Sequence, residues 1–127
     1  MLIYIIGKIA GNPDYCEQFA RAEDALHREY PCDVINPAKR RPGLLQADYA
    51  GLSYDAVMKA DAVACLWTVE DSFGAAMERH VAKSTGKLMM NIAPDYKIKE
   101  VDAIAPSLER ALLSKPERWA EIERGLK

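Results

Sequence analysis

The amino-acid sequence predicts an α/β fold: a doubly wound parallel sheet of four to five strands with helices on both faces. Short apolar runs alternate along the chain with segments of helical periodicity, which is the pattern of βαβ units. The runs are continuously apolar, as is typical of parallel strands that are buried on both faces. The length of 127 residues, half of them hydrophobic, is enough for one compact domain with its own core.

The first third of the chain is predicted to form a strand, a helix and a second strand. Residues 2–6 are a continuous apolar run, and a turn-rich loop follows over residues 8–14. The helix after this loop ends before Pro31, because a residue that precedes proline disfavours helical backbone. Residues 32–35 are the second predicted strand. Apolar residues keep helical spacing between the two strands: Phe19, Ala22, Ala25, Leu26 and Tyr30.

The middle of the chain repeats the alternation. A loop is predicted over residues 38–47 and a helix over residues 48–59. Residues 61–67 form the third apolar strand, and the helix after it extends to Ser84. A glycine just beyond the last turn of that helix is a typical helix stop. Residues 87–92 are the fourth predicted strand.

The chain beyond residue 94 has a weaker pattern. Residues 96–98 are a candidate for a short edge strand. Helical spacing returns over residues 105–113 and again after Pro116, so residues 105–127 are predicted to be a C-terminal helical extension. An apolar stripe runs along its second part: Trp119, Ile122 and Leu126. Such a stripe requires a cover, either the domain itself or a partner subunit.

Composition argues against several classes of partner. Seventeen basic and nineteen acidic residues give a net charge of −2, which argues against bulk nucleic-acid binding. The cysteines Cys16, Cys32 and Cys65 are far apart, so they predict a reduced compartment and no metal framework. No apolar run approaches the length of a membrane span, and residues 2–6 are too short for the core of a signal peptide. The sequence therefore predicts a soluble cytoplasmic protein with no membrane partner.

Topology predicts where a ligand binds. In the common strand order 2-1-3-4, the winding of the chain reverses between the first and the third strand, and ligands bind beyond the carboxyl ends of the strands at that point. The loops that meet there are residues 7–14 and residues 67–74. The second loop leads into a helix, whose first backbone N–H groups are unpaired and attract an anion or a sugar hydroxyl.

The residues around this helix start are the candidates for chemistry. Glu78 follows Ser72 by six residues, so it projects from the second turn of the helix back toward the loop. It is either a carboxylate nucleophile at an anomeric carbon or a charge that complements the helix dipole. Asp71 either caps the helix or protonates a leaving base. Trp67 either stacks on a nucleobase or packs in the core.

A longer pattern links these residues to a known family. The pattern comprises Tyr4 and Gly7 around the end of the first strand, Asn36-Pro37 after the second, and the segment Ser72-x-Gly74-Ala75-x-x-Glu78, followed by Ala82 and Gly86. With it, the chain resembles the nucleoside 2-deoxyribosyltransferase superfamily over about residues 1–92. Within that superfamily the small DUF4406-type proteins look closest, because a tryptophan precedes their serine as Trp67 does here.

The resemblance implies a flavodoxin/Rossmann-like fold in which residues 1–127 are a single domain. It implies cleavage of the N-glycosidic bond of a (deoxy)nucleoside or nucleoside monophosphate, by a hydrolase or a deoxyribosyltransferase, without metal or organic cofactor. The alternative is a non-catalytic nucleotide-binding or sensor module on the same fold. The resemblance further implies a homodimer or larger homo-oligomer in which a neighbouring subunit completes the pocket.

The resemblance also implies roles for individual residues. By motif match Glu78 would be the nucleophile, with Tyr4 near it in the pocket, and Ser72 and Gly74 would hold the 5′ end of the sugar. From their places in the two loops, Asp71 is added as a supporting group, and Gly7, Lys8 and Trp67 as substrate-binding residues. The family has a helper carboxylate eight residues before the position of Asp61, where this chain has Ser53. The carboxylates nearest to that position are Asp55 and Asp48.

Overall fold

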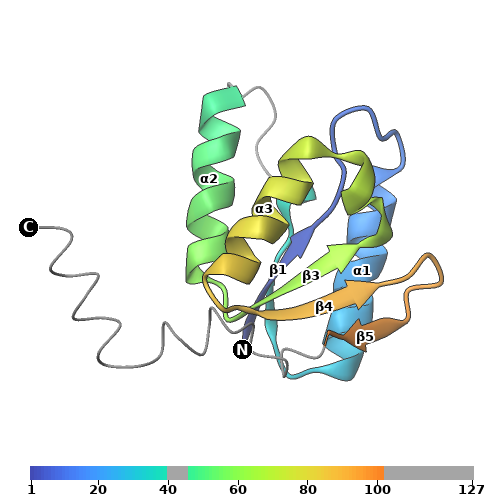
Figure 1. Cartoon of the computed structure of the whole chain (residues 1–127). Helices are drawn as coiled ribbons and strands as arrows, with labels where there is room; N and C mark the ends of the chain where they lie inside the picture. Colours follow the sequence, from blue (N-terminus) through green and yellow to red (C-terminus); the bar gives the residue numbers. More distant parts are fainter. Residues whose placement is uncertain (40–45, 102–127) are drawn as a thin grey trace, which may run out of the picture.

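The fold is built on a five-stranded sheet. The computed structural model describes residues 1–39 and 46–101, and within them the strands lie in the order β2-β1-β3-β4-β5 (Figure 1). Their bounds are Leu2–Ile6 (β1), Asp33–Ile35 (β2), Ala62–Leu66 (β3), Leu88–Ile92 (β4) and Ile98–Glu100 (β5). The first four strands are parallel, and β5 runs antiparallel to β4. The predicted order 2-1-3-4 is confirmed.

Helices cover both faces of the sheet, as predicted. α1 (Tyr15–Glu29) packs on one face, and α2 (Gln46–Lys59) and α3 (Phe73–Ser84) lie side by side on the other (Figure 1). This arrangement is compatible with a flavodoxin/Rossmann-like fold. No described helix combines the length and the apolar composition that crossing a membrane requires.

The hydrophobic core has one part on each side of the sheet. Alternate residues of the two central strands pack with Phe19, Ala22 and Leu26 of α1. The residues between them, among which are Tyr4 and Cys65, pack with α2 and α3. Central strands with apolar side chains on both faces explain why their sequences are continuously apolar.

The bounds of several elements differ from the predicted ones by one or two residues; α2, for example, begins at Gln46 instead of residue 48. Trp67 lies beyond the end of β3, in a 3-10 helix (η2, Trp67–Asp71). A second 3-10 helix (η1, Pro37–Lys39) occupies the start of the predicted loop. β5 is displaced by two residues from the predicted strand 96–98, because Tyr96 belongs to the turn between β4 and β5. Residues 40–45 of the predicted loop and the predicted helical extension at residues 105–127 lie outside the described residues.

α3 ends at the glycine that the sequence indicates. Gly86 has a φ of 74°, in the left-handed region that glycine adopts without a Cβ penalty. Its N–H donates to the carbonyl of Lys83 at 3.2 Å, and the N–H of Lys87 donates to the carbonyl of Ala82 at 3.0 Å. This pair of bonds defines a Schellman motif, which satisfies two of the last carbonyls of the helix.

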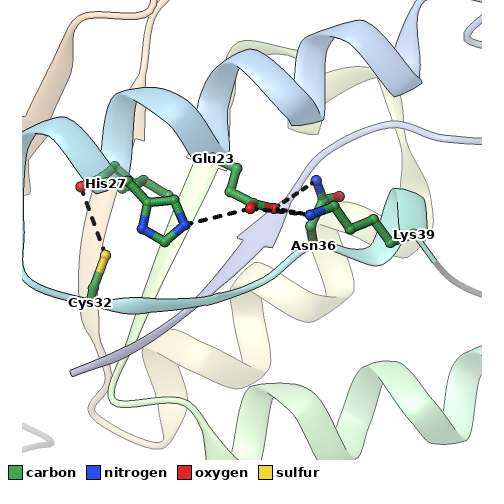
Figure 2. Close-up of polar contacts among 6 residues, drawn as sticks. Glu23, His27, Cys32, Asn36 and Lys39 are labelled. Carbon is green, nitrogen blue, oxygen red and sulfur yellow. Dashed lines mark hydrogen bonds and ion pairs between the residues drawn. The ribbon is translucent and has the colours of Figure 1, made fainter.

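A polar cluster ties α1 to the carboxyl end of β2 (Figure 2). The Glu23 carboxylate accepts hydrogen bonds from Asn36 Nδ2 and Lys39 Nζ, both at 3.2 Å, and His27 Nε2 lies 3.5 Å from it. Burial raises the pKa of Glu23, but the hydrogen bonds and the charge of Lys39 outweigh burial and hold the pKa below its ordinary value of 4.5. Asn36 Oδ1 accepts from the Ala38 amide, so the Asn36-Pro37 pair has a structural role here.

Acid is expected to weaken this cluster. A carboxylate whose pKa is lowered by folding stabilises the protein above its unfolded pKa, and this stabilisation is lost as the pH falls through the lower folded value. Glu23→Gln is expected to remove that part of the acid sensitivity and to lower the free energy of unfolding at neutral pH by about 1 kcal/mol. Urea unfolding at neutral and acidic pH measures both effects, with Glu17→Gln on the exposed side of α1 as control. Identical pH dependence in the wild type and Glu23→Gln would contradict the prediction.

Candidate functional site

The candidate site lies at the carboxyl edge of the sheet, where β1 and β3 end side by side. The loop after β1 and the η2 helix after β3 meet there, as predicted from the strand order. A hydrogen bond joins them: the Lys8 backbone N–H donates to Thr68 Oγ1 at 3.0 Å. The two segments are sixty residues apart in sequence, with α1, β2, η1, α2 and β3 between them, so this bond links parts of the edge that are distant along the chain.

η2 spans the edge of the sheet and is anchored on both sides. Trp67 packs against the core on the α1 side, whereas Val69 is buried in the core under α2 and α3. Thr68, between them, accepts the Lys8 bond. The Ser72 N–H donates to the Val69 carbonyl at 3.1 Å and so connects η2 to the start of α3.

Ser72 caps α3. Its backbone is extended, and its Oγ accepts a hydrogen bond from the Ala75 N–H at 3.2 Å. This is the bond of an N-cap, so the predicted capping role of Asp71 is wrong: Asp71 is the last residue of η2, and its side chain is exposed. The reason is the 3-10 helix, which includes Asp71 and leaves the next residue, Ser72, at the cap position of α3.

A pair of substitutions tests this assignment. Ser72→Ala is expected to lower the free energy of unfolding by about 1 kcal/mol, because the Ala75 N–H loses its acceptor. Asp71→Ala is expected to change it by less than about 0.5 kcal/mol, since the side chain is exposed. Urea denaturation measures both values. The reverse order of effects would restore Asp71 as the cap.

The first turn of α3 is open. Among the described residues, the N–H groups of Phe73 and Gly74 donate no hydrogen bond, as expected for the first positions of a helix. Apart from its two chain neighbours and the nearby backbone of α3 itself, no heavy atom lies within 4 Å of the place that a Cβ on Gly74 would occupy. Phe73 is 84% exposed. A small anionic or hydroxyl group therefore has access to these two amides.

Glu78 lies on the side of α3 that faces the sheet. It is half-buried, and it occupies the same helical stripe as Ala75 and Ala82, which are buried in the core. Its charge acts on the thiol of Cys65 in β3: burial, together with the Glu78 and Glu70 carboxylates, raises the pKa of Cys65 to about 12. Cys65 therefore stays protonated and is not a nucleophile. A carboxylate on a core-facing stripe is uncommon without a functional or pairing reason.

The structure brings Tyr4 to the same side of the sheet as Glu78. Tyr4 is 1% exposed and belongs to the buried cluster that includes Cys65 and the two alanines flanking Glu78. Trp67 is on the opposite side, where its ring makes an edge contact with Tyr96, with ring centroids 5.6 Å apart and an angle of 81°. The predicted pocket residues are thus divided between the two faces.

Gly7 is required by packing. A Cβ at this position would lie 2.8 Å from Leu66 Cδ1 and 3.0 Å from Phe19 Cζ, closer than real Cβ contacts. Gly7 therefore lets β3 and α1 approach the end of β1, while Lys8 follows with its backbone at the edge. The role of Gly7 in substrate binding stays a prediction.

The helper carboxylate has no match on the described part of α2. Ser53 is half-buried, on the same stripe as the buried residues Ala56, Val57 and Ala60. Asp55 is exposed on the other side of the helix, so it does not replace a carboxylate at Ser53. The side chain of Asp48 lies outside the described residues.

Three features of the site were missed at the sequence level. Thr68 accepts the Lys8 bond, and no short-range pattern indicates a pairing across sixty residues. Arg79 forms an ion pair with Glu70, which joins α3 to η2; the Glu–Arg spacing of nine residues is not a helical one. Tyr96 contacts Trp67 from the turn between β4 and β5. Among described residues, no group of three or more His, Cys, Asp or Glu side chains is arranged to hold a metal ion.

A family model matches most of the chain. It is described as a domain of unknown function, DUF4406, and it covers residues 1–91, which include β1, β3, η2 and α3. No curated protein matches the chain. The match supports the DUF4406 part of the resemblance inferred from the sequence. Because it spans more than half of the chain, the protein belongs to the DUF4406 family.

Proposed function

We propose that the protein cleaves the N-glycosidic bond of a (deoxy)nucleoside or nucleoside monophosphate, with Glu78 as nucleophile. The position of Glu78 carries the proposal: a half-buried carboxylate on the sheet-facing stripe of α3, the helix that follows β3 at the edge where β1 and β3 end side by side. The resemblance to the nucleoside 2-deoxyribosyltransferase superfamily supports the same role, and it also supports a cytoplasmic homo-oligomer.

The reaction follows from the chemistry of a carboxylate. Glu78 attacks C1′ of the sugar as an oxocarbenium-like transition state develops, and the base leaves with the electron pair of the C1′–N bond. Asp71 or a water supplies the proton that the base takes up. Water then attacks C1′ of the glycosyl ester, passes a proton to Asp71 or to solvent, and releases the Glu78 carboxylate. In a transfer, a ring nitrogen of a second base attacks C1′ instead and loses its proton in the same way.

The start of α3 is the proposed subsite for the 5′ end of the sugar. The open N–H groups of Phe73 and Gly74 and the positive end of the helix dipole favour a hydroxyl or a phosphate. Ser72 Oγ already accepts from Ala75, and its hydroxyl hydrogen is left to donate to the ligand. A sugar held there places C1′ toward the second helical turn, which carries Glu78.

A substrate panel tests the proposal. Purified protein is incubated with nucleosides, deoxynucleosides and their 5′-monophosphates, and free base is measured by chromatography beside the Glu78→Ala variant. Release of at least one base by the wild type, abolished in Glu78→Ala, is the expected result. Release that is unchanged in the variant would overturn the mechanism. Light scattering of the same samples tests the homo-oligomer.

A non-catalytic nucleotide-binding module is the second candidate. Ser53 at the position of the family's helper carboxylate, with Asp55 turned to solvent, favours it. Calorimetry distinguishes the two: a nucleotide that binds without turnover over hours supports the binding module. Base release in the panel supports the enzyme.

A further inference from the structure

We propose that Tyr96 is a positioning residue for the site at the start of α3, acting through Trp67 and η2. Tyr96 lies in the turn between β4 and β5, which leaves the sheet at the same edge as η2, because Leu66 pairs with Ile92 in the parallel register of β3 and β4. Its effect on ligand binding rests on the function proposed above; its effect on η2 does not.

The backbone conformation of Tyr96 is costly for a tyrosine, so a tyrosine at this position needs a reason. Its φ is 63°, and it is the one non-glycine residue with positive φ in the described part of the chain. This region is disfavoured for a bulky L-residue, and glycine would adopt it freely. The turn closes through backbone bonds, such as that from the Tyr96 N–H to the Ala93 carbonyl at 2.7 Å. Turn closure alone therefore calls for glycine, not tyrosine.

The ring contacts supply that reason. Tyr96 packs edge-on with Trp67 at 5.6 Å, and the Arg21 guanidinium of α1 lies over the Tyr96 ring, 5.6 Å from its centroid. Both are favourable geometries for aromatic rings. Trp67 is the first residue of η2, so the turn and α1 together hold one end of η2 in place.

The other end of η2 leads into the candidate site. Thr68 Oγ1 accepts a hydrogen bond from the Lys8 N–H, and the Val69 carbonyl accepts one from the N–H of Ser72, the cap of α3. A change in the position of Trp67 is therefore transmitted to the loop after β1 and to the cap. Tyr96 is neither donor nor acceptor in these two hydrogen bonds, so its effect on them is indirect.

Hydrogen exchange in the ligand-free protein tests the proposal independently of function. Tyr96→Gly keeps the turn but removes the ring, and it is expected to speed exchange of the Lys8 amide about tenfold. The Lys87 amide, bonded to Ala82 at the far end of α3, is expected to stay unchanged. Tyr96→Phe restores the ring and is expected to restore wild-type exchange. Lys97→Ala, in the same turn, is the matched control.

Each of three results in the exchange experiment would overturn the proposal. They are unchanged exchange of the Lys8 amide in Tyr96→Gly, equal acceleration of exchange at the Lys8 and Lys87 amides, and failure of Tyr96→Phe to restore protection of the Lys8 amide. If Tyr96→Gly does not fold, Trp67→Leu removes the same ring pair from the other side and is expected to expose the Lys8 amide equally. The double variant Tyr96→Gly/Trp67→Leu is a further test. If the effects of Tyr96→Gly and Trp67→Leu on exchange of the Lys8 amide simply add in this double variant, the two residues do not act through a shared contact, and the proposal is wrong.

Binding of 2-deoxyribose 5-phosphate tests the link to function. Calorimetry is expected to show about tenfold weaker binding in Tyr96→Gly than in the wild type, with Tyr96→Phe equal to wild type. If the wild type does not bind this probe, the proposed function loses its support at the 5′ subsite, while the exchange experiment still decides the role of Tyr96. If binding is unchanged in Tyr96→Gly although Lys8 exchange is faster, Tyr96 positions η2 but not the ligand site, and the proposal is wrong.

Discussion

Glu78→Gln is expected to lower the rate of base release about a thousandfold or more, while ligand affinity changes by less than about threefold. Glutamine has nearly the shape of glutamate and fits the same half-buried place on α3. It has no charged oxygen to attack C1′, so the covalent step is lost while the sugar and the base are held as before. Single-turnover kinetics and calorimetry with the substrate found in the panel measure the two quantities separately.

Glu70→Gln is the matched control for this experiment. Glu70 is exposed on η2 and paired with Arg79, and its carboxylate acts on the Cys65 thiol as the Glu78 carboxylate does. The substitution therefore removes one nearby negative charge without touching the proposed nucleophile. Near wild-type rates are expected for Glu70→Gln. An equal loss of rate in Glu78→Gln and Glu70→Gln would mean that the rate of base release depends on the local negative charge. Substantial turnover by Glu78→Gln would exclude Glu78 as the nucleophile.

Strand pairing and helix placement were predictable because they depend on patterns within short segments. Continuous apolar runs over β1 and β3 require burial on both faces, and right-handed crossovers then leave few possible strand orders. The same reasoning located the edge where η2 and the loop after β1 meet. The same patterns did not predict the last residue of β3.

The end of β3 determines which face Trp67 occupies. In β3, Ala62, Ala64 and Leu66 face α1, whereas Val63 and Cys65 face α2 and α3. By the alternation of side chains, a strand that continued through Trp67 would place its ring on the side of α2 and α3, the side to which Glu78 belongs. Because the backbone turns into η2 at that residue, Trp67 joins the α1 side instead. An error of one residue in a predicted strand therefore changes the composition of the predicted pocket.

The cap of α3 was unpredictable for a related reason. Asp71 and Ser72 are adjacent, and both residue types are favoured as N-caps. The choice depends on which backbone is extended when the helix begins, and η2 keeps Asp71 in helical geometry while Ser72 is extended. η2 in turn depends on burial of Val69 and on the contact between Trp67 and Tyr96. Tertiary packing thus decides between two residues with equal local preference.

Gly7→Ala and Gly74→Ala are expected to change stability in opposite directions. The Cβ of Gly7→Ala would lie 2.8 Å from Leu66 Cδ1 and 3.0 Å from Phe19 Cζ. Phe19 is fully buried and Leu66 nearly so, so neither side chain has room to move away. Overpacking of this kind costs about 1–3 kcal/mol of the free energy of unfolding. Gly74→Ala meets no atom within 4 Å and gains about 0.5 kcal/mol, because alanine favours helical backbone.

Urea unfolding measures the difference in the free energy of unfolding between the two variants. Ligand binding by Gly74→Ala tests the proposed subsite at the start of α3. Gly74→Ala is expected to be at least as stable as the wild type yet to bind 2-deoxyribose 5-phosphate about tenfold more weakly, because its methyl group occupies the space beside the open amides. Unchanged affinity in Gly74→Ala would remove the start of α3 from the proposed subsite. A loss of stability in Gly74→Ala as large as that in Gly7→Ala would show that Gly74, too, is a packing residue, and its open surroundings would then need another explanation than access for a ligand.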